Sequence, residues 1–413
     1  MQKFDLPTGF SVGSAKINVN PPLGISLAGH GVENAKTRLS TENWDEISIC
    51  CTAFSDGEEV ALICTFDCSC IAEHIAAPML KMLEESFGIP EKNVILQATH
   101  THAGPTMYSR HELFPGVAEY LDTVFHPALL KVAEEALTDL APAKLFIGKG
   151  KTEKLNYVRR YVSRVDGSFL GNWPENGQDG TKIMHESEPD EEMQVMRFVR
   201  EGKKDVILVN WQCHPTSSGG SKKTNTSSDW PGIVRNTVGE AEDAICVFHQ
   251  GAAGNLIPYS AIEGEKGYPG DAFREHGALI SQTALEILKN NMTPARTGKL
   301  IITKEQFPMK RKEGRDTTIP LSVIAMGDVA FAATPNETFC QNGKEVKDGS
   351  PFKMTFFCEL TNGDRGYIPS AECFKNGGYE VRTCPHGEGA GERIAGELLY
   401  MLKGNYTNLD EGE

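Results

Sequence analysis

Three apolar, strand-like segments of this sequence each lead to a side chain that could bind a metal ion. They are residues 93–100 (NVILQATH), 206–215 (VILVNWQCHP) and 329–337 (VAFAATPNE), and the side chains are His100, His214 and Glu337. Ligands in α/β proteins bind beyond the carboxyl ends of strands, where a rigid scaffold meets open space. Two imidazoles and one carboxylate suit Zn²⁺ and leave a coordination position open. These residues are far apart in the sequence, so only a folded sheet could join them, and a histidine after a strand is otherwise commonly a loop or core residue.

A second histidine follows the first at His102, in the segment ATHTHAGP. Alternation along an extended strand would place His100 and His102 on one face and the two neighbouring threonines on the other. Both imidazoles could then bind a metal. Alternatively, His100 binds the metal and His102 acts as an acid, a base or an oxyanion partner. A hydrogen-bonded surface turn is the third interpretation, and the residue types leave all three open.

Alternating strand and helix patterns predict the elements that must position these side chains. Apolar runs predict a hairpin with its turn at Asp56-Gly57 and further strands, over residues 47–70, 93–100, 143–150 and 192–215. Helical spacing predicts helices over residues 72–88, 117–140 and 387–402. We therefore predict an α/β fold of mixed β-sheets flanked by helices, with the metal site at strand ends. Because there is no linker and no internal repeat, we predict one domain over residues 1–413.

Two polar segments interrupt this pattern, at residues 163–190 and 217–228. Both are rich in Gly, Ser and Asn, and both are too long to be simple connectors. In a compact enzyme such segments more often cover a site than link domains, although disorder would have the same composition. We expect them to cover the metal site.

The charge and cysteine content restrict the partners and the compartment. The chain has 41 Lys and Arg against 56 Asp and Glu, a formal charge of −15, which repels nucleic acid and offers no basic face to anionic lipid. We expect no export leader, and the sequence has no continuous apolar run of membrane length. The eleven cysteines lack zinc-module or Cys-x-x-Cys spacing and indicate reduced, buried thiols. We predict a cytoplasmic protein that acts on a small-molecule substrate without stable membrane association; its oligomeric state stays open.

Several short motifs occur together in an order that is typical of one enzyme family. They are ATHTHAGP, NWQCHPTSSGG, SSDWPG, HQGAAGNLIP, TPNET and GYEVRTCPHGEGAGERI. In this order they resemble the catalytic domain of the neutral/alkaline non-lysosomal ceramidase family, and the resemblance covers nearly the whole chain. It implies a neutral-ceramidase-like catalytic domain that holds one zinc ion.

The resemblance also implies the individual site residues. The family's four zinc ligands match His100, His214, Glu337 and Tyr367. The family's second functional tyrosine lies twelve residues after the first, and this position is Tyr379.

Two further matches concern catalysis. His102 matches the family residue that faces the scissile carbonyl. The family's site arginine matches Arg159 in the segment NYVRRYV, with Arg160 as the neighbouring alternative.

The chain departs from the family in several places. Ile257 stands where ceramide-cleaving members carry a serine. We expect neither the C-terminal immunoglobulin-like domain nor the export signal of those members, which disfavours ceramide itself as the substrate. Asp229, in SSDWPG, matches a motif position where a helix N-cap and a catalytic role are both open.

Together these observations predict a zinc-dependent hydrolase of an amide bond in a soluble small molecule or N-acyl compound. Zinc lowers the pKa of its water from about 15.7 to about 7, and this water attacks the acyl carbon. His102 would move the proton to the leaving group, and Tyr379 and Arg159 would stabilise the oxyanion. The alternatives are a zinc esterase or lactonase, a zinc-dependent lyase or isomerase, and a non-catalytic metal-binding relative.

Overall fold

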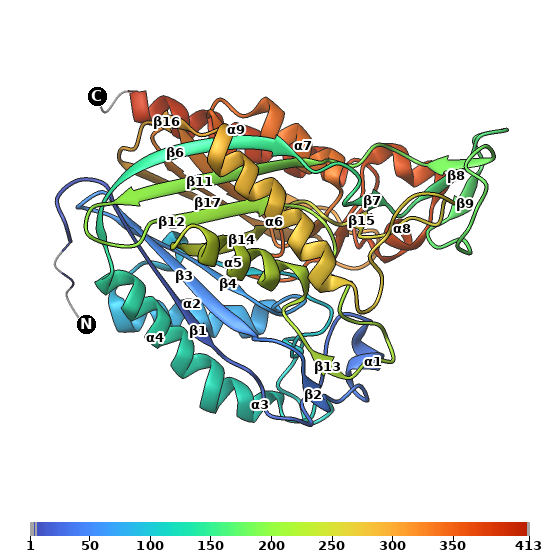
Figure 1. Ribbon diagram of the computed structural model, residues 1–413, viewed down its shortest axis with the longest axis horizontal. Coiled ribbons are helices and arrows are strands. Elements are labelled where there is room, and N and C mark those ends of the chain that lie inside the picture. Colours follow the sequence, from blue (N-terminus) through green and yellow to red (C-terminus); the bar gives the residue numbers. More distant parts are fainter. Residues whose placement is uncertain (1–3, 5, 411–413) are drawn as a thin grey trace.

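A mixed sheet of nine strands forms the centre of the computed structural model, which describes residue 4 and residues 6–410 (Figure 1). Its strand order is β14-β12-β11-β6-β1-β3-β4-β5, and β16 pairs with β6. The strands are β1 (Ser11–Asn18), β3 (Ser48–Ser55), β4 (Val60–Phe66), β5 (Val94–Ala98), β6 (Ala141–Lys151), β11 (Glu192–Arg200), β12 (Val206–Trp211), β14 (Ile245–Gln250) and β16 (Thr293–Ala295). The β4–β5 and β12–β14 pairs are parallel.

A second sheet packs against the first through an aromatic core. It has the order β17-β18-β19-β21. Its strands are β17 (Leu300–Met309), β18 (Thr317–Met326), β19 (Val329–Ala333) and β21 (Met354–Cys358). The ring centroid of Phe54 lies 5.6 Å from that of Phe198, which belongs to the same sheet. It lies 5.8 Å from that of Phe331, which belongs to the second sheet. Burial of these large rings holds the two sheets face to face.

Helices cover the outer faces of both sheets, so the layers run helix, sheet, sheet, helix (Figure 1). The central sheet is covered on one part by α2 (Glu73–Phe87) and α4 (His126–Thr138), and on another by α5 (Asp229–Ala241) and α6 (Phe273–Asn290). The second sheet is covered by α7 (Cys340–Gly349) and α9 (Ala390–Asp410). This arrangement confirms the predicted α/β fold of mixed sheets flanked by helices.

Short elements connect the layers and form the surroundings of the site. The short helical elements are α1 (Val32–Ala35), η1 (Glu91–Asn93), α3 (Val117–Tyr120), the π-helical turn η2 (Leu121–Phe125), η3 (Ala371–Asn376) and α8 (Tyr379–Thr383). The short strand pairs are β2 (Glu42–Asn43) with β13 (Asn225–Thr226), β7 (Tyr157–Val158) with β15 (Leu256–Ile257), and β20 (Glu337–Thr338) with β22 (Tyr367–Ile368).

The first polar segment, residues 163–190, contributes to a small sheet that projects from the body of the molecule (Figure 1). This sheet consists of β8 (Tyr161–Ser163), β9 (Phe169–Gly171) and β10 (Ile183–His185), in the order β10-β8-β9. We call residues 161–185 the arm. Part of the segment that composition describes as a loop is therefore folded into strands.

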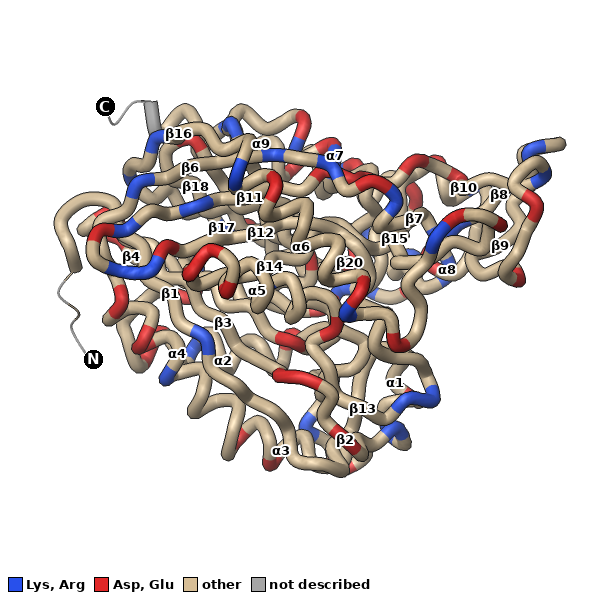
Figure 2. The backbone as a smooth tube through the Cα atoms, viewed as in Figure 1, with Lys and Arg blue, Asp and Glu red and all other residues tan. Residues whose placement is uncertain are grey.

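Charged residues of both signs are interspersed over the elements (Figure 2).

The predicted hairpin is confirmed, because β3 pairs with β4 around Asp56 and Gly57, and Gly57 has the positive φ of 95° that such a turn requires. The three predicted helices are also present as α2, as α3 to α4, and as α9. Within residue 4 and residues 6–410, no helix combines the length and the apolar character needed to cross a bilayer.

Candidate metal centre

The three predicted metal ligands from strand ends lie together at one edge of the two sheets. His100 follows β5, His214 follows β12, and Glu337 begins β20 shortly after β19. Glu337 and Tyr367 are direct partners in the parallel β20–β22 pair, so this short ladder places the phenol beside the carboxylate. Strand ends that are distant in the sequence thus supply one site, as expected at the carboxyl ends of strands.

The ligand atoms of these residues converge. The Oε2 atom of Glu337 lies 3.2 Å from Nε2 of His100 and 3.3 Å from Nε2 of His214. His102 joins them, with its Nε2 atom 3.4 Å from Nε2 of His100. One ligand atom from each of the three histidines lies within 4.8 Å of the others, so this cluster could hold a metal ion.

The tautomers of two histidines are fixed by backbone carbonyl groups. Nδ1 of His100 faces the carbonyl oxygen of Ser69, and Nδ1 of His214 lies 2.8 Å from that of Ala253 and 2.9 Å from that of Leu256. Each Nδ1 therefore carries the donated proton, and each Nε2 turns a lone pair toward the Glu337 carboxylate. Three electron-pair donors that face one another fit a divalent cation between them.

The surroundings also set the charges of these groups. Burial alone would raise the pKa of Glu337, but His100 and His214 hold it well below its usual range, so the carboxylate is ionised. Burial and the charge of Arg159 lower the pKa of His214 to about 4. Burial, with His100 and other neighbouring cationic groups, lowers the pKa of His102. Ionised carboxylate and neutral imidazole are the forms that bind metals.

His100 and Tyr367 differ from this pattern. Burial lowers the pKa of His100, but the adjacent Glu337 outweighs burial and raises it overall. Burial and Glu337 both raise the pKa of the Tyr367 phenol. Because the raised pKa keeps the Tyr367 phenol neutral, Tyr367 is a weaker donor than the other three residues.

Arg159 connects the metal ligands with the rest of the site. Its Nη1 atom lies 3.4 Å from Nε2 of His214, and its Nη2 atom donates to the hydroxyl of Tyr367 at 3.1 Å. Its Nε atom donates to Glu380 at 2.8 Å. Arg160 instead donates to Glu186, Glu380 and the carbonyl oxygen of Gly377. Of the two arginines, Arg159 is therefore the one that faces the predicted ligands.

Tyr379 lies on the same side as Arg159. Its ring centroid is 5.5 Å from that of Tyr367. The guanidinium carbon of Arg159 lies 5.9 Å from the Tyr379 ring centroid. All seven residues predicted for the site thus lie in one contiguous cluster, while their roles as ligands and catalysts stay a prediction.

The expected backbone of the His-x-His segment is wrong. β5 ends at Ala98, His100 has a φ of 71°, and residues 102 and 103 form a turn, so this segment is not an alternating strand. The backbone N–H of His102 donates to the carbonyl oxygen of Pro215, and Nη1 of Arg38 donates to the carbonyl oxygen of His102. These long-range bonds hold the turn, and the two imidazoles meet edge to face with centroids 4.8 Å apart.

Asp229 has a structural position at the start of α5. Its Oδ1 accepts the N–H of Trp230 at 2.7 Å, and its Oδ2 accepts both the N–H and the hydroxyl of Ser218. It thereby ties the segment 217–228 to the start of the helix, but Ser228 holds the N-cap position and the bond to Trp230 is not the N2 or N3 contact of an N-cap side chain.

His30 is a neighbour of the site that the sequence analysis missed. Its ring centroid lies 5.3 Å from that of His102, and its Nε2 atom is buried without a hydrogen-bond partner. The preceding Gly29 has a φ of 110°, and a Cβ there would lie 2.5 Å from Cβ of His102. The Gly-His-Gly triplet in an otherwise apolar segment was the available signal.

Glu359 is a second missed neighbour. It follows β21 directly, and its Oε2 accepts the backbone N–H groups of Ala253 and Thr338. Burial raises its pKa to about 8. An acid at a strand end was the available signal here.

A cavity of about 640 Å³ opens beside Tyr379 and Arg159. Trp173 forms part of its wall, with a ring centroid 5.3 Å from that of Tyr379 and 5.7 Å from the guanidinium carbon of Arg159. Ile257, which replaces the family serine, lines the same cavity. The cavity therefore adjoins the cluster through Trp173, although none of the seven predicted residues lines it.

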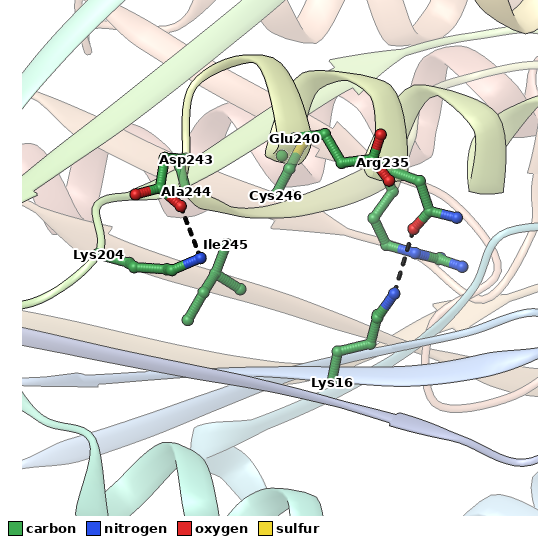
Figure 3. Close-up of a pocket in the computed structure, with 10 residues that line it drawn as sticks. Lys16, Lys204, Arg235, Glu240, Asp243, Ala244, Ile245 and Cys246 are labelled. Atoms are coloured by element: carbon green, nitrogen blue, oxygen red, sulfur yellow. Dashed lines mark hydrogen bonds and ion pairs between the residues drawn. The ribbon is translucent and has the colours of Figure 1, made fainter.

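Another hollow of about 480 Å³ lies between α5 and the central sheet, and its basic side chains are paired with other residues (Figure 3). Lys204 lies 2.7 Å from Asp243, and Lys16 donates to the side chain of Asn236 at 3.1 Å. Arg235 is bound to the buried Asp67. This hollow contains none of the predicted site residues.

Known proteins resemble the chain in sequence over part of its length. The Pseudomonas aeruginosa protein "Neutral ceramidase" is 24% identical over 269 residues, which cover 62% of this chain and 37% of that protein. "Neutral ceramidase B" of Dictyostelium discoideum is 25% identical over 35% of the chain. "Neutral ceramidase" of Oryza sativa subsp. japonica is 27% identical over 36% of it. The matched segments span 20% and 19% of these two proteins, so the chain matches well under two thirds of each relative.

Solved structures resemble the fold over almost the whole chain. A structure titled "Ceramidase complexed with C2" has a TM-score of 0.77 at 15% identity and covers 98% of this chain and 76% of that chain. The neutral ceramidase crystal structure from Pseudomonas aeruginosa has a TM-score of 0.74 at 15% identity and covers 96% and 74%. The family model described as neutral/alkaline non-lysosomal ceramidase, N-terminal, matches residues 21–253. The chain therefore belongs to the neutral/alkaline non-lysosomal ceramidase family.

Proposed function

We propose that this protein is a zinc-dependent hydrolase that cleaves an amide bond in a small N-acyl substrate. The observation that carries the proposal is the convergence of Nε2 of His100, Nε2 of His214 and Oε2 of Glu337, all of them electron-pair donors. These three residues and Tyr367 would hold the zinc ion. When bound, zinc lowers the pKa of a water molecule to about 7 and polarises a substrate carbonyl.

Arg159 and Tyr379 would stabilise the negative charge that develops on the carbonyl oxygen. Burial lowers the pKa of Arg159, but Tyr367 and Glu380 outweigh burial and raise it overall, so the guanidinium stays charged. Its bond to Glu380 fixes its direction. A charged donor held in place before the reaction stabilises an oxyanion without reorganisation.

His102 would move the proton between the attacking water and the leaving amine. It is neutral, because burial and neighbouring cations lower its pKa. Its Nε2 atom lies 3.4 Å from Nε2 of His100 and therefore faces the proposed metal site, where it would accept the proton. A positioned imidazole of this kind typically contributes about 10²–10⁴-fold to the rate.

We further propose that residues 1–413 act as one catalytic unit, with the segments 163–190 and 217–228 covering the site. The contacts of Trp173 with Tyr379 and Arg159 support this for the first segment. For the second, Ser218 is bound to Asp229, and a Cβ at Gly219 would lie 3.5 Å from the carbonyl oxygen of His102.

We also propose that the protein works in the reducing cytoplasm. All eleven cysteines lie within the described part of the chain, and each is buried and free of a disulfide. Exported proteins more often pair such residues.

Product masses test the proposed chemistry. Zinc-loaded protein is incubated with N-acyl amines of increasing acyl length, with the corresponding esters, and with a short-chain ceramide, and products are identified by mass spectrometry. We expect a carboxylic acid and an amine whose masses sum to the substrate plus one water.

Other products would contradict an amidohydrolase. Turnover of the esters alone would make the protein an esterase, and products without a gain of water would make it a lyase or an isomerase. Zinc binding without turnover of any compound would leave a metal-binding relative. The incubation with short-chain ceramide decides whether Ile257 in place of the family serine excludes that substrate.

A further inference from the structure

The cavity beside the proposed metal centre is lined by both polar and apolar side chains. Residues 161 and 172–177 of the arm supply one wall, and residues between 257 and 269 supply the other. The residues that carry the inference are Trp173, Asn176, Tyr259, Ser260, Glu263 and Glu265. Because Trp173 contacts both Tyr379 and Arg159, a group bound against its ring would lie next to the two proposed oxyanion donors.

One wall of the cavity is held in place by a network of hydrogen bonds. Oε2 of Glu265 lies 2.9 Å from Nε2 of His185, and the hydroxyl of Ser260 lies 3.1 Å from the same nitrogen. Nδ1 of His185 donates to the carbonyl oxygen of Val158, and its ring stacks on Tyr157 with centroids 5.7 Å apart. The Glu265 carboxylate is therefore positioned before any ligand arrives.

This carboxylate remains available as an acceptor. Burial would raise the pKa of Glu265, but Ser260 and His185 outweigh burial and lower it, so the group is charged. The side chain is still 29% exposed. Two residues earlier, the Glu263 side chain adds a second carboxylate to the same wall.

The wall formed by the arm offers a flat apolar surface. Trp173 is 53% exposed, which is unusual for so large an apolar side chain unless a ligand or partner covers it. Its indole ring and Tyr259 face the same cavity as the carboxylates. Aromatic faces and positioned polar groups together are typical of sites for small polar molecules.

The combination excludes two classes of ligand. A long alkyl chain would remove water from Glu263 and Glu265 without replacing their hydrogen bonds, at a large cost in free energy. An anion would be repelled by the same carboxylates, and none of the described residues that line the cavity is Lys or Arg.

A cation is also a poor match, because Glu265 already faces His185 and is influenced by Lys154. A ring that carries several hydroxyl groups matches both the polar groups and the aromatic surface of the cavity. Its hydroxyls donate to the carboxylates and to Ser260, and its C–H face packs on the exposed indole of Trp173.

We propose that this cavity binds a polyhydroxylated, sugar-like part of the substrate, which is the amine side of the amide bond. The inference rests on the proposed amide hydrolysis for its link to catalysis, but the binding itself does not require zinc. Glu265 and Trp173 would be the residues that determine specificity.

Binding to the full-length protein tests the cavity directly. The probes are N-acetylglucosamine and N-acetylgalactosamine, and the dissociation constant is measured by titration calorimetry. We expect both Glu265→Gln and Trp173→Ala to weaken binding by about tenfold or more. The first removes a charge-assisted hydrogen bond, and the second removes the stacking surface. Glu175→Gln is the matched control, since Glu175 is exposed on the same segment and outside the cavity lining; it should bind like the unmodified protein.

Hydrolysis of matched amides separates this inference from the proposed function. N-cyclohexylacetamide is a matched amide whose ring has no hydroxyls. We expect kcat/KM for the better of the two sugars to exceed that for N-cyclohexylacetamide by about tenfold or more. Glu265→Gln should abolish this difference. Sugar binding without turnover of any amide would support the cavity and contradict the hydrolase. Turnover of N-cyclohexylacetamide as fast as the sugars, or no binding of either sugar, would overturn the inference and leave the hydrolase intact.

Discussion

Replacement of His214 with alanine is expected to reduce bound zinc from one ion per chain to below about a tenth of that value, and to remove nearly all turnover. His214 is fully buried, its Nδ1 proton is donated to backbone carbonyl groups, and its Nε2 lone pair faces Glu337. Loss of one of the protein ligands leaves an incomplete coordination shell, and metal affinity falls steeply. Elemental analysis after dialysis measures the metal content.

Two further variants make this test independent of folding defects. Glu337→Gln keeps the side-chain volume but removes the charge, and it should lose zinc as His214→Ala does. His111→Ala makes the same change at an exposed histidine and should keep the metal. If the two site variants retain native circular dichroism and a full complement of zinc, these residues are not ligands.

Replacement of His102 with alanine is expected to keep zinc but to lower kcat by about a hundredfold or more, because the proposed proton carrier is lost while the proposed ligands remain. Tyr379→Phe should behave similarly, since it removes only a hydroxyl that would stabilise the oxyanion, and the loss of one such donor typically costs about 10²–10³ in kcat. Steady-state kinetics together with metal analysis check both variants.

The outcome for His102 also decides between the two roles that the sequence leaves open. Its Nε2 atom lies within the histidine cluster that could hold a metal, so loss of zinc in His102→Ala would make it a third imidazole ligand and contradict its role in proton transfer. Tyr400→Phe is the control for Tyr379→Phe, because Tyr400 is 74% exposed on α9. It should leave both kcat and zinc content unchanged.

The elements of the fold were predictable where the signal is local. The β3–β4 hairpin follows from two apolar runs around Asp56 and Gly57, and α2 follows from its apolar spacing and the glycine at its end. The positive φ of His100 was not predictable, because residues distant in the sequence hold this backbone. The N–H groups of His100 and His102 donate to the carbonyl oxygens of Cys68 and Pro215, and Arg38 donates to the carbonyl oxygen of His102.

The candidate site was predictable in part for the same reason. His100, His214 and Glu337 could be identified because each follows an apolar run, and sheet folds gather strand ends. Tyr367 carries no such signal: only the pairing of two short parallel strands places it beside Glu337, and the resemblance to known enzymes was needed to find it.

Arg159 and His30 also reach the site through folding that the local sequence does not show. Arg159 belongs to a short irregular stretch, and its neighbour Arg160 is an identical residue type that folding directs to Glu186. His30 lies in a loop without periodicity, and it reaches His102 only because Gly29 allows a close approach.

Anomalous diffraction at the zinc absorption edge, from crystals of protein purified at neutral pH, tests the central claim most directly. We predict one anomalous peak at bonding distance, about 2.0–2.2 Å, from Nε2 of His100, Nε2 of His214 and the carboxylate of Glu337. Ordered electron density for these side chains with no anomalous peak between them, or a peak bound only by other residues, would contradict the proposed metal centre.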